Sequence, residues 1–262
     1  MDFLDRSRSV HCYCCIQSHR DRSNCRQERD ECGTLTAVWE HSLPNKTART
    51  GAALVLSLLT SVAALALFGW LADKVVHGAT LRFDLQVRAA VHGIASPELT
   101  TAMLVITSLG SGIFLLAATG LAFVTFLTVN WHRAAVWLLI AMVGAAVLNS
   151  AMKHSFHRPR PSPFFNYPLP ASESFPSGHA LASFCFYGAV AALCSSRLRA
   201  RPLQISVWVA AMALIAIIGF SRIYLGVHYF SDVLGGYLAA GVWVGALAAA
   251  DSYYSERKRQ RV

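Results

Sequence analysis

Charged side chains are scarce in this sequence of 262 residues: Asp, Glu, Lys and Arg make up 14% of it, against 55% hydrophobic residues. A soluble domain usually carries about 25% charged residues. The hydrophobic residues also occur in long runs. The shortage of charge therefore excludes an ordinary soluble domain and places the chain among integral membrane proteins.

A basic patch interleaved with aromatic residues, which is typical of nucleic-acid-binding proteins, is missing although the formal net charge is +9. Lys and Arg are instead concentrated at the ends of hydrophobic runs, where they fix the orientation of a membrane protein. We therefore expect a membrane-embedded protein with no nucleic-acid partner.

Residues 1–50 lack hydrophobic periodicity, and they lack the short apolar core and cleavage site of a secretory signal. Five of the seven cysteines lie here: Cys12, Cys14, Cys15, Cys25 and Cys32. We interpret the segment as a disordered, cysteine-rich cytoplasmic tail with reduced thiols. Two alternatives stay open, namely a zinc site that includes Cys12 and Cys15, and a true start downstream of Met1.

Six hydrophobic runs approach the about 20 residues that a helix needs to cross a bilayer. They are 52–71, 112–129, 134–151, 180–196, 203–220 and 233–250. The mixed segment 81–109 is interpreted as an amphipathic surface stretch that ends at Gly110 and Gly112. The pattern predicts an all-α polytopic protein, with six transmembrane helices over 51–250 and a basic cytoplasmic tail over 251–262.

The distribution of Lys and Arg predicts the orientation of these spans. With residues 1–50 inside, sixteen basic residues fall on the cytoplasmic side and seven on the opposite side. Cytoplasmic segments near a membrane carry an excess of Lys and Arg. We therefore expect a protein of the bacterial inner (plasma) membrane whose large polar segments face the non-cytoplasmic side.

Three polar segments interrupt the hydrophobic runs on that predicted outer side: 153–161, 176–179 and 221–232. They contain the cations Lys153, Arg160 and Arg222, and charges at membrane ends are costly unless they are paired or functional. Arginine offers a planar fork of donors for phosphate oxygens, and lysine adds a point charge. Ser177 and Gly178 precede a predicted helix, whose N-terminus favours an anion. The set predicts a cradle for a tetrahedral oxyanion.

The same segments contain two histidines and a carboxylate that could carry out chemistry. His228 and Asp232 are four residues apart, which puts them on one face of a helix. The carboxylate can hold one ring nitrogen protonated and leave the other free to attack phosphorus. His179 can protonate the leaving oxygen. None of these spacings is typical of a metal cluster, so we expect no metal and no cofactor.

The composite pattern resembles the three-part signature of the type 2 phosphatidic acid phosphatase superfamily, in its membrane lipid phosphate phosphatase branch. Its parts are K-x6-RP starting at Lys153, PSGH ending at His179 and SR-x5-H-x3-D ending at Asp232. The resemblance implies a helical bundle of the type shared with haloperoxidases. It implies phosphate binding by Lys153, Arg160, Ser177, Gly178 and Arg222. It implies catalysis by His228 as nucleophile, Asp232 as its orienter and His179 as general acid.

The expected activity is hydrolysis of a lipid phosphomonoester or diphosphate, such as phosphatidic acid, phosphatidylglycerophosphate or undecaprenyl pyrophosphate, through a phosphohistidine. The alternative is a non-catalytic membrane transporter or binder of an anionic lipid. A vanadium haloperoxidase is disfavoured because it needs a soluble scaffold. The motifs determine neither the particular lipid nor the oligomeric state. Arg158 is interpreted as a membrane anchor, and Asp84 and Glu173 as solvated.

Overall fold

A computed structural model describes residues 46–260, most of which lie in the compact unit Ala52–Val262. Within 46–260 the secondary structure is entirely helical. The helices are α2 (Lys46–Val76), α3 (Leu81–Gly93), α4 (Pro97–Ser108), α5 (Gly112–Thr128), α6 (His132–Ser155), α7 (Gly178–Ser195), α8 (Arg201–Tyr224) and α9 (Phe230–Gln260). The all-α prediction is therefore confirmed for this part of the chain, whereas the predicted cysteine-rich tail lies almost wholly outside it.

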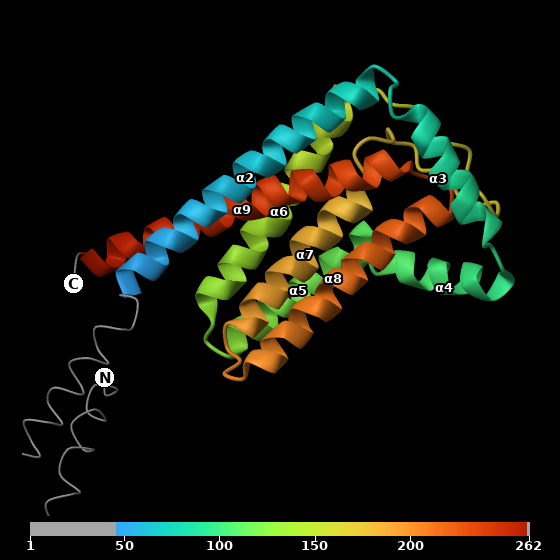
Figure 1. The fold of residues 1–262 in the computed structure, drawn as a ribbon. Helices are drawn as coiled ribbons and strands as arrows, with labels where there is room; N and C mark the ends of the chain where they lie inside the picture. The colour runs from blue at the N-terminus through green and yellow to red at the C-terminus, as the bar shows by residue number, and fades with distance from the viewer. Residues whose placement is uncertain (1–45, 261–262) are drawn as a thin grey trace, which may run out of the picture. The chain divides into compact units, whose positions relative to one another are not determined.

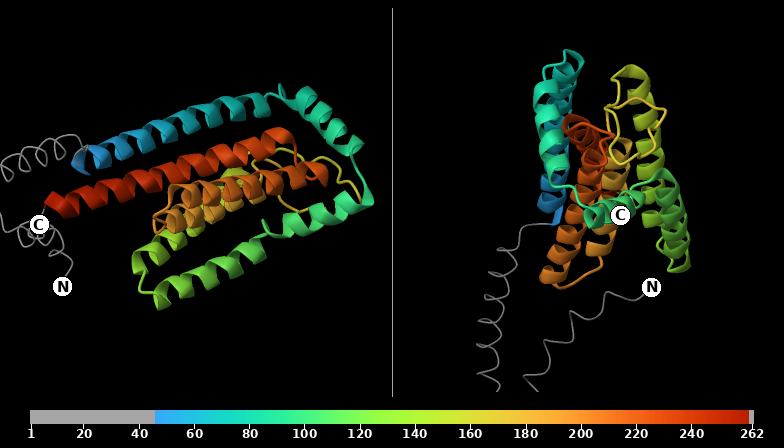
Figure 2. Two further views of the ribbon diagram at one scale, coloured as in Figure 1. Left: turned by 60° about the horizontal axis from the view of Figure 1, so that its bottom comes forward. Right: turned by 90° about the vertical axis from the view of Figure 1, so that its right-hand side faces the viewer.

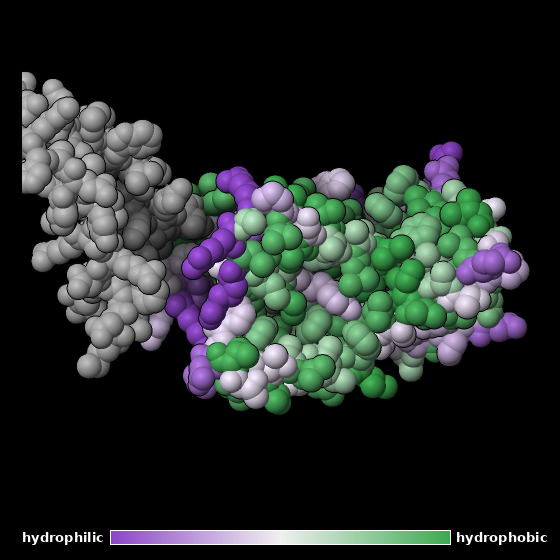
Figure 3. Space-filling view, turned by 90° about the horizontal axis from the view of Figure 1, so that it is seen from below, coloured by the Kyte–Doolittle hydropathy of each residue, from purple (hydrophilic) through white to green (hydrophobic). Residues whose placement is uncertain are grey.

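Five helices, namely α2, α6, α7, α8 and α9, are long and apolar enough to cross a membrane. Helices α4 and α5 pass the same test only as a pair, and they are bent by 50° at the break between them. The predicted six spans are obtained when this pair counts as one. On the face shown in Figure 3, hydrophobic side chains cover the middle of the bundle, and hydrophilic ones gather toward its two ends.

The segment 81–109 differs from the predicted surface stretch. It forms two helices, of which α3 lies across one end of the bundle while α4 turns back along it (Figure 1). Ser96 caps α4 by accepting a hydrogen bond from the backbone N–H of Leu99 at 3.1 Å. Helix α4 is part of the core because Met103 and Thr107 are buried. The expectation is wrong for α4, which pairs with α5 to complete a span, whereas most residues of α3 are exposed as expected.

The break between α4 and α5 lies beside His179 of α7 and Ile218 of α8. A side chain at Gly110 would place its Cβ 2.5 Å from Ile218 Cγ2 and 3.3 Å from His179 Cδ2. Glycine at this position therefore lets the bend pack against α7 and α8. The sequence prediction of a break at Gly110 and Gly112 is confirmed.

Small residues let the long helices approach each other closely, as is common in membrane bundles. On α9, a Cβ at Gly236 would lie 2.6 Å from the carbonyl oxygen of Ser177 at the start of α7. Further along α9, Gly245 lies against Ser61 of α2. Trp243 packs on Gly144 of α6 and donates a hydrogen bond to the Ala141 carbonyl at 3.0 Å. These contacts fix α9 against three helices.

The connections place three polar parts at one end of the bundle: helix α3, the segment 156–177 and the segment 225–229 (Figure 2). The connections 129–131 and 196–200 lie at the other end. Residues 251–260, part of the predicted basic tail 251–262, continue α9 as helix. Because successive helices cross the bundle in opposite directions, the polar segments 153–161, 176–179 and 221–232 come together at one end.

Candidate active site

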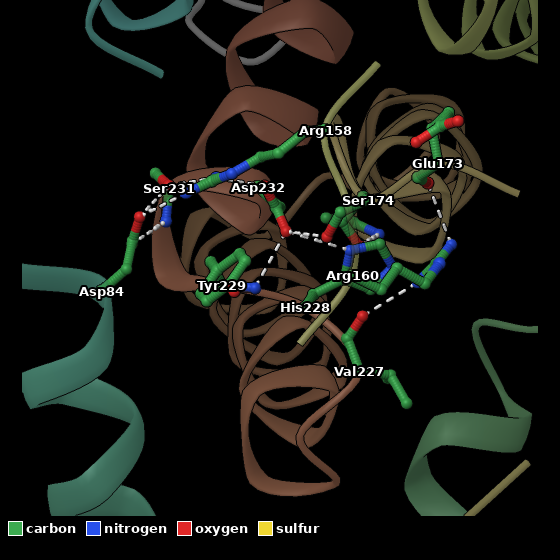
Figure 4. A network of polar contacts seen from close by, with 12 residues as sticks. Asp84, Arg158, Arg160, Glu173, Ser174, Val227, His228, Tyr229, Ser231 and Asp232 are labelled. Carbon is green, nitrogen blue, oxygen red and sulfur yellow. Dashed lines mark hydrogen bonds and ion pairs between the residues drawn. The ribbon is translucent and has the colours of Figure 1, made fainter. Parts of the chain in front are cut away.

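His228 lies in the short connection between α8 and α9, and Asp232 lies in the first turn of α9. Their side chains meet, with His228 Nδ1 3.4 Å from Asp232 Oδ2 (Figure 4). The same carboxylate oxygen accepts hydrogen bonds from the Ser174 hydroxyl at 2.5 Å and from the Tyr229 backbone N–H at 2.8 Å. Both His228 and Asp232 are buried. The carboxylate is therefore fixed behind the imidazole.

The other nitrogen of the His228 ring faces a cation. Arg160 Nη1 lies 2.9 Å from His228 Nε2, and arginine can only donate. Nε2 therefore carries the lone pair, and the ring proton sits on Nδ1 beside Asp232. Burial lowers the pKa of His228 to about 4, although the hydrogen bond to Asp232 opposes this. The imidazole is neutral at pH 7 and has its free nitrogen on the side of the cations.

Lys153 and Arg160 are both tied to the segment 172–173. Lys153, at the end of α6, donates to the Glu173 carbonyl at 2.6 Å and to the Ser172 hydroxyl at 3.1 Å. Arg160 donates from Nε to the Ser172 carbonyl at 2.5 Å and from Nη1 to the Val227 carbonyl at 2.9 Å. Burial and the nearby Arg222 lower the pKa of Arg160 to about 10. Arg160 thus stays charged at neutral pH, and the two cations converge without a carboxylate partner among the described residues.

Arg222 is the most deeply buried cation of the group, with 1% of its surface exposed. Its Nη1 donates to the Thr107 hydroxyl at 2.6 Å and to the Tyr167 hydroxyl at 3.2 Å. Its Nε has no hydrogen-bond partner within residues 46–260. A buried, unpaired donor is costly, so this N–H is suited to an anion that enters the site.

The N-terminus of α7 completes the arrangement. Ser177 precedes the helix, and its hydroxyl accepts from the backbone N–H of Ala180 at 3.5 Å. Its backbone N–H donates to the Asp232 carbonyl at 2.9 Å, which links α7 to α9. Gly178 and His179 form the first turn. The His179 ring has no hydrogen bond to another residue of the described chain. It faces a cavity that it shares with His228.

A cavity of about 530 Å³ joins these groups. Its polar end is lined by Lys153, Arg160, Ser172, Gly178, His179, Arg222 and His228. Its apolar end runs between α5 and α6, where it is lined by Leu115, Leu116, Leu139, Met142, Val143 and Ala146. Several of these apolar side chains are exposed, including Leu116 at 76% and Val143 at 55%. The cavity therefore leads from a cationic cluster to the hydrophobic exterior.

Six of the eight predicted site residues line this cavity, and two do not. Asp232 lies behind His228, as its predicted orienting role requires. Ser177, predicted to bind phosphate, is buried and caps α7. Within 46–260 no group of three His, Cys, Asp or Glu residues could hold a metal ion. The cysteines of the alternative zinc site lie outside the described residues.

Two residues were misjudged from the sequence. Asp84 is fully buried rather than solvated, and Arg158 forms ion pairs with Asp84 at 2.8 Å and with Asp232 at 2.5 Å rather than anchoring the membrane edge. One sequence feature could have indicated this pairing: both residues are charged and lie near membrane ends, where charges need partners. The sequence offered no spacing that connected residue 84 to residue 158. Glu173 is half-buried, and its backbone rather than its carboxylate contacts the site.

Comparison with known proteins gives concordant matches. The sequence profile described as the PAP2 superfamily matches residues 134–256. Phosphatidylglycerophosphatase B of Bacillus subtilis (strain 168) is 32% identical over 157 residues, which cover 59% of this chain and 76% of the relative. A lipid A 1-phosphatase of Rhizobium johnstonii is 33% identical over 132 residues, or 47% of this chain and 49% of the relative. The chain thus spans about half the length of the Rhizobium enzyme.

The fold comparison agrees. The crystal structure of a transmembrane PAP2 type phosphatidylglycerolphosphate phosphatase from Bacillus subtilis superposes with a TM-score of 0.67 and 28% sequence identity. The match covers 74% of this chain and 96% of that structure. The helical arrangement described above is therefore shared along nearly the whole length of a solved membrane phosphatase.

Proposed function

Since the chain belongs to the PAP2 superfamily, we propose that it removes the terminal phosphate of a membrane lipid by way of a phosphohistidine on His228. One observation carries the proposal. A neutral imidazole presents its free Nε2 to a cationic cavity while a buried carboxylate, Asp232, holds the opposite nitrogen. Binding or transport of an anion requires the cations but does not require this pair.

In the first half-reaction, the lipid phosphate enters among Lys153, Arg160 and Arg222, and its phosphorus approaches His228 Nε2. Arg160 then exchanges its contact with Nε2 for a phosphate oxygen. The Nε2 lone pair forms the N–P bond as the P–O bond to the lipid breaks, and His179 protonates the departing oxygen. Asp232 stabilises the positive charge that develops on the imidazole.

In the second half-reaction, water attacks the phosphorus of the phosphohistidine. His179, now neutral, accepts a proton from this water, and the N–P bond breaks to release inorganic phosphate and regenerate His228. Gly178 and His179, at the N-terminus of α7, line the same cavity as His228, and the backbone N–H groups of a helix N-terminus favour negative charge. The fixed cations stabilise the charge on the equatorial oxygens in both steps.

A lipid is the substrate class because of the shape of the cavity. The face of α6 that carries Lys153 also carries Asn149, Ala146, Met142 and Leu139 at helical spacing, and all five line the cavity. Over the 14 residue steps from Leu139 to Lys153, a helix rises about 20 Å. A phosphate held at Lys153 would therefore leave its hydrocarbon chain along an apolar stripe that opens between α5 and α6.

We assign the site to the non-cytoplasmic face of a bacterial inner membrane. The excess of Lys and Arg at the opposite end of the bundle supports this orientation. The segments 156–177 and 225–229, which contribute Arg160 and His228 to the cavity, share one end of the bundle. The available lipid pool would then be the outer leaflet.

The decisive experiment separates the two histidines by the leaving group. His228→Ala removes the atom that bonds phosphorus, so hydrolysis of every substrate should fall to background. His179→Ala removes the proton donor, which is worth about 10²–10⁴-fold in rate. That loss should shrink on p-nitrophenyl phosphate, whose leaving group departs without a proton.

The purified variants are compared on phosphatidic acid in detergent micelles and on the activated ester, with insertion checked by detergent extraction. Radiolabelled phosphate should be trapped on wild type and absent from His228→Ala. Activity and a trapped phosphoenzyme in His228→Ala would show that another residue is the nucleophile. Equal rescue of both variants by the activated ester would contradict the division of roles.

A further inference from the structure

A buried ion-pair relay connects helix α3 to the orienting carboxylate behind His228. Asp84, in the first turn of α3, accepts from the Ser231 backbone N–H at 2.9 Å, from the Ser231 hydroxyl at 2.6 Å and from Arg158 Nη2 at 2.8 Å. Arg158 Nη1 in turn donates to Asp232 Oδ1 at 2.5 Å and to the Ser231 hydroxyl at 2.7 Å (Figure 4). One guanidinium therefore joins two carboxylates.

The relay is mostly buried and lies outside the cavity. Asp84 and Asp232 have no exposed side-chain surface, and the Arg158 side chain is 11% exposed. The Arg158 guanidinium also stacks on the Tyr229 ring at 4.3 Å. Arg158 and Asp84 do not line the cavity that holds the phosphate-binding cations. Buried charges of this kind need partners, and here each charge has one.

The two oxygens of Asp232 have separate partners. Oδ1 receives Arg158, whereas Oδ2 receives Ser174, Tyr229 and His228. Arg158 thus fixes the plane of the carboxylate and leaves Oδ2 directed at the imidazole. It also supplies the positive charge that keeps Asp232 compatible with a second buried carboxylate nearby. Asp84 anchors Arg158 to α3.

We propose that Arg158 and Asp84 are positioning residues of the phosphatase, which hold Asp232 in the orientation and charge state that His228 needs during phosphoryl transfer. This inference rests on the proposed function. Neither residue touches the substrate, so both act on the chemical step through Asp232. Helix α3, which the sequence indicated only as a surface stretch, is then part of the catalytic support.

Charge changes in the relay have opposite expected effects on His228. Other ionisable groups surround the His228–Asp232 pair: Lys153 from α6, Arg160 and Glu173 from the segment 156–177, His179 from α7 and Arg222 from α8. None of these residues is changed in the test. Removing the Arg158 cation leaves more of the Asp232 charge for His228 and raises the pKa of its imidazole. Removing the Asp84 anion lowers the pKa of the His228 imidazole.

The test uses the full chain in detergent, with Arg158→Met, Arg158→Lys, Asp84→Asn and a matched control, Arg88→Met. Arg88 lies on the same α3, stacks on Phe164 at 4.0 Å and donates to the Ser162 carbonyl, but has no contact with Asp232. Steady-state kinetics on phosphatidic acid are measured across pH, together with inhibition by inorganic phosphate.

Arg158→Met should reduce kcat at least tenfold, with KM and the phosphate inhibition constant changed less than threefold. The acid limb of its kcat profile should move to higher pH, and that of Asp84→Asn to lower pH. Arg158→Lys should recover part of kcat, and Arg88→Met should match wild type. A purely structural role would lower the amount of folded protein in both relay variants without moving the limbs apart.

Two results would overturn the relay while leaving the phosphatase intact: an active wild type whose Arg158→Met variant keeps its kcat, or relay variants whose acid limbs coincide with that of wild type. If Arg158→Met does not fold, the isosteric Asp84→Asn variant still tests the sign of the shift. A wild type that releases no phosphate from any lipid phosphate would instead contradict the proposed function itself.

Discussion

The neutral state of His228 leads to a quantitative prediction about acid pH. Burial lowers the pKa of its imidazole to about 4, from an ordinary value of about 6.5. The nucleophile must be unprotonated. At about pH 5, a histidine with the lowered pKa is about 90% neutral, whereas an ordinary histidine is about 3% neutral. We therefore expect His228 to remain a competent nucleophile at pH 5.

Direct titration measures this separately from the ionisation of the substrate. Protein labelled with 15N-histidine is followed by NMR in detergent between pH 3.5 and 8, and the His228 signals are identified by their loss in His228→Ala. Nε2 should keep the chemical shift of an unprotonated nitrogen at pH 5 and change only near pH 4. Titration of this signal between pH 6 and 7 would refute the argument from burial.

The lowered pKa of His228 also makes the free energy of unfolding depend on pH. Because the folded-state pKa of His228 lies below the unfolded value, folding disfavours the bound proton. The stabilisation due to neutral His228 is present above about pH 6.5 and is lost as the pH falls toward about 4. The free energy of unfolding of His228→Gln should therefore depend less on pH in this window than that of wild type. An identical dependence would place the titrating group elsewhere.

Four further outcomes are expected. Phosphatase activity should persist in excess EDTA, because the phosphate clamp consists of Lys and Arg; recovery by added magnesium or zinc after its loss would contradict this. Arg222→Lys keeps the charge but loses the guanidinium Nε–H, and kcat/KM should fall about 10²–10³-fold. In a cysteine-free background, a cysteine at Asn166 should be labelled in intact cells and one at Arg199 only after permeabilisation; the reverse pattern would place the site in the cytoplasm. Deleting residues 1–45 should preserve activity, since every residue that lines the cavity lies at position 110 or later; an inserted but inactive truncation would implicate the cysteines.

Most of the fold could be predicted because membrane spans have a strong signal in composition. The long hydrophobic runs correspond to α2, α6, α7, α8 and α9. The signal failed where a span is broken, since α4 alone is only 12 residues long and its partner α5 is short too. Helix α3 has no hydrophobic run, and it is held by Asp84, whose partners Arg158 and Ser231 lie far away in the sequence.

The candidate site was predictable to the extent that its residues are close in sequence or form a motif. The helical spacing predicted that His228 and Asp232 meet, and they do, although His228 lies in the connection just before α9 and only Asp232 is in the helix. Placing Lys153 and Arg222 in the same site as His228 and Asp232 required the assumption that the three polar segments lie on one side of the membrane. Arg158 was misjudged because Arg158 and Arg160 stand in the same short sequence, and only tertiary structure separates the one that reaches Asp232 from the one that lines the cavity.

The arrangement also explains how the imidazole of His228 can stay neutral among so many charges. Burial is the main cause of the lowered pKa of His228, and Arg160 and Arg222 lower it further while Asp232 opposes them. Arg160 and Arg222, which we propose bind phosphate, therefore also keep the proton off Nε2. When a phosphate dianion enters, it neutralises part of that field, so the imidazole becomes more basic as the substrate arrives. Asp84 and Arg158 act on the opposite side of the ring, through Asp232, which we propose stabilises the positive charge that develops on the imidazole. Substrate binding and nucleophile activation are thus coupled through a single imidazole.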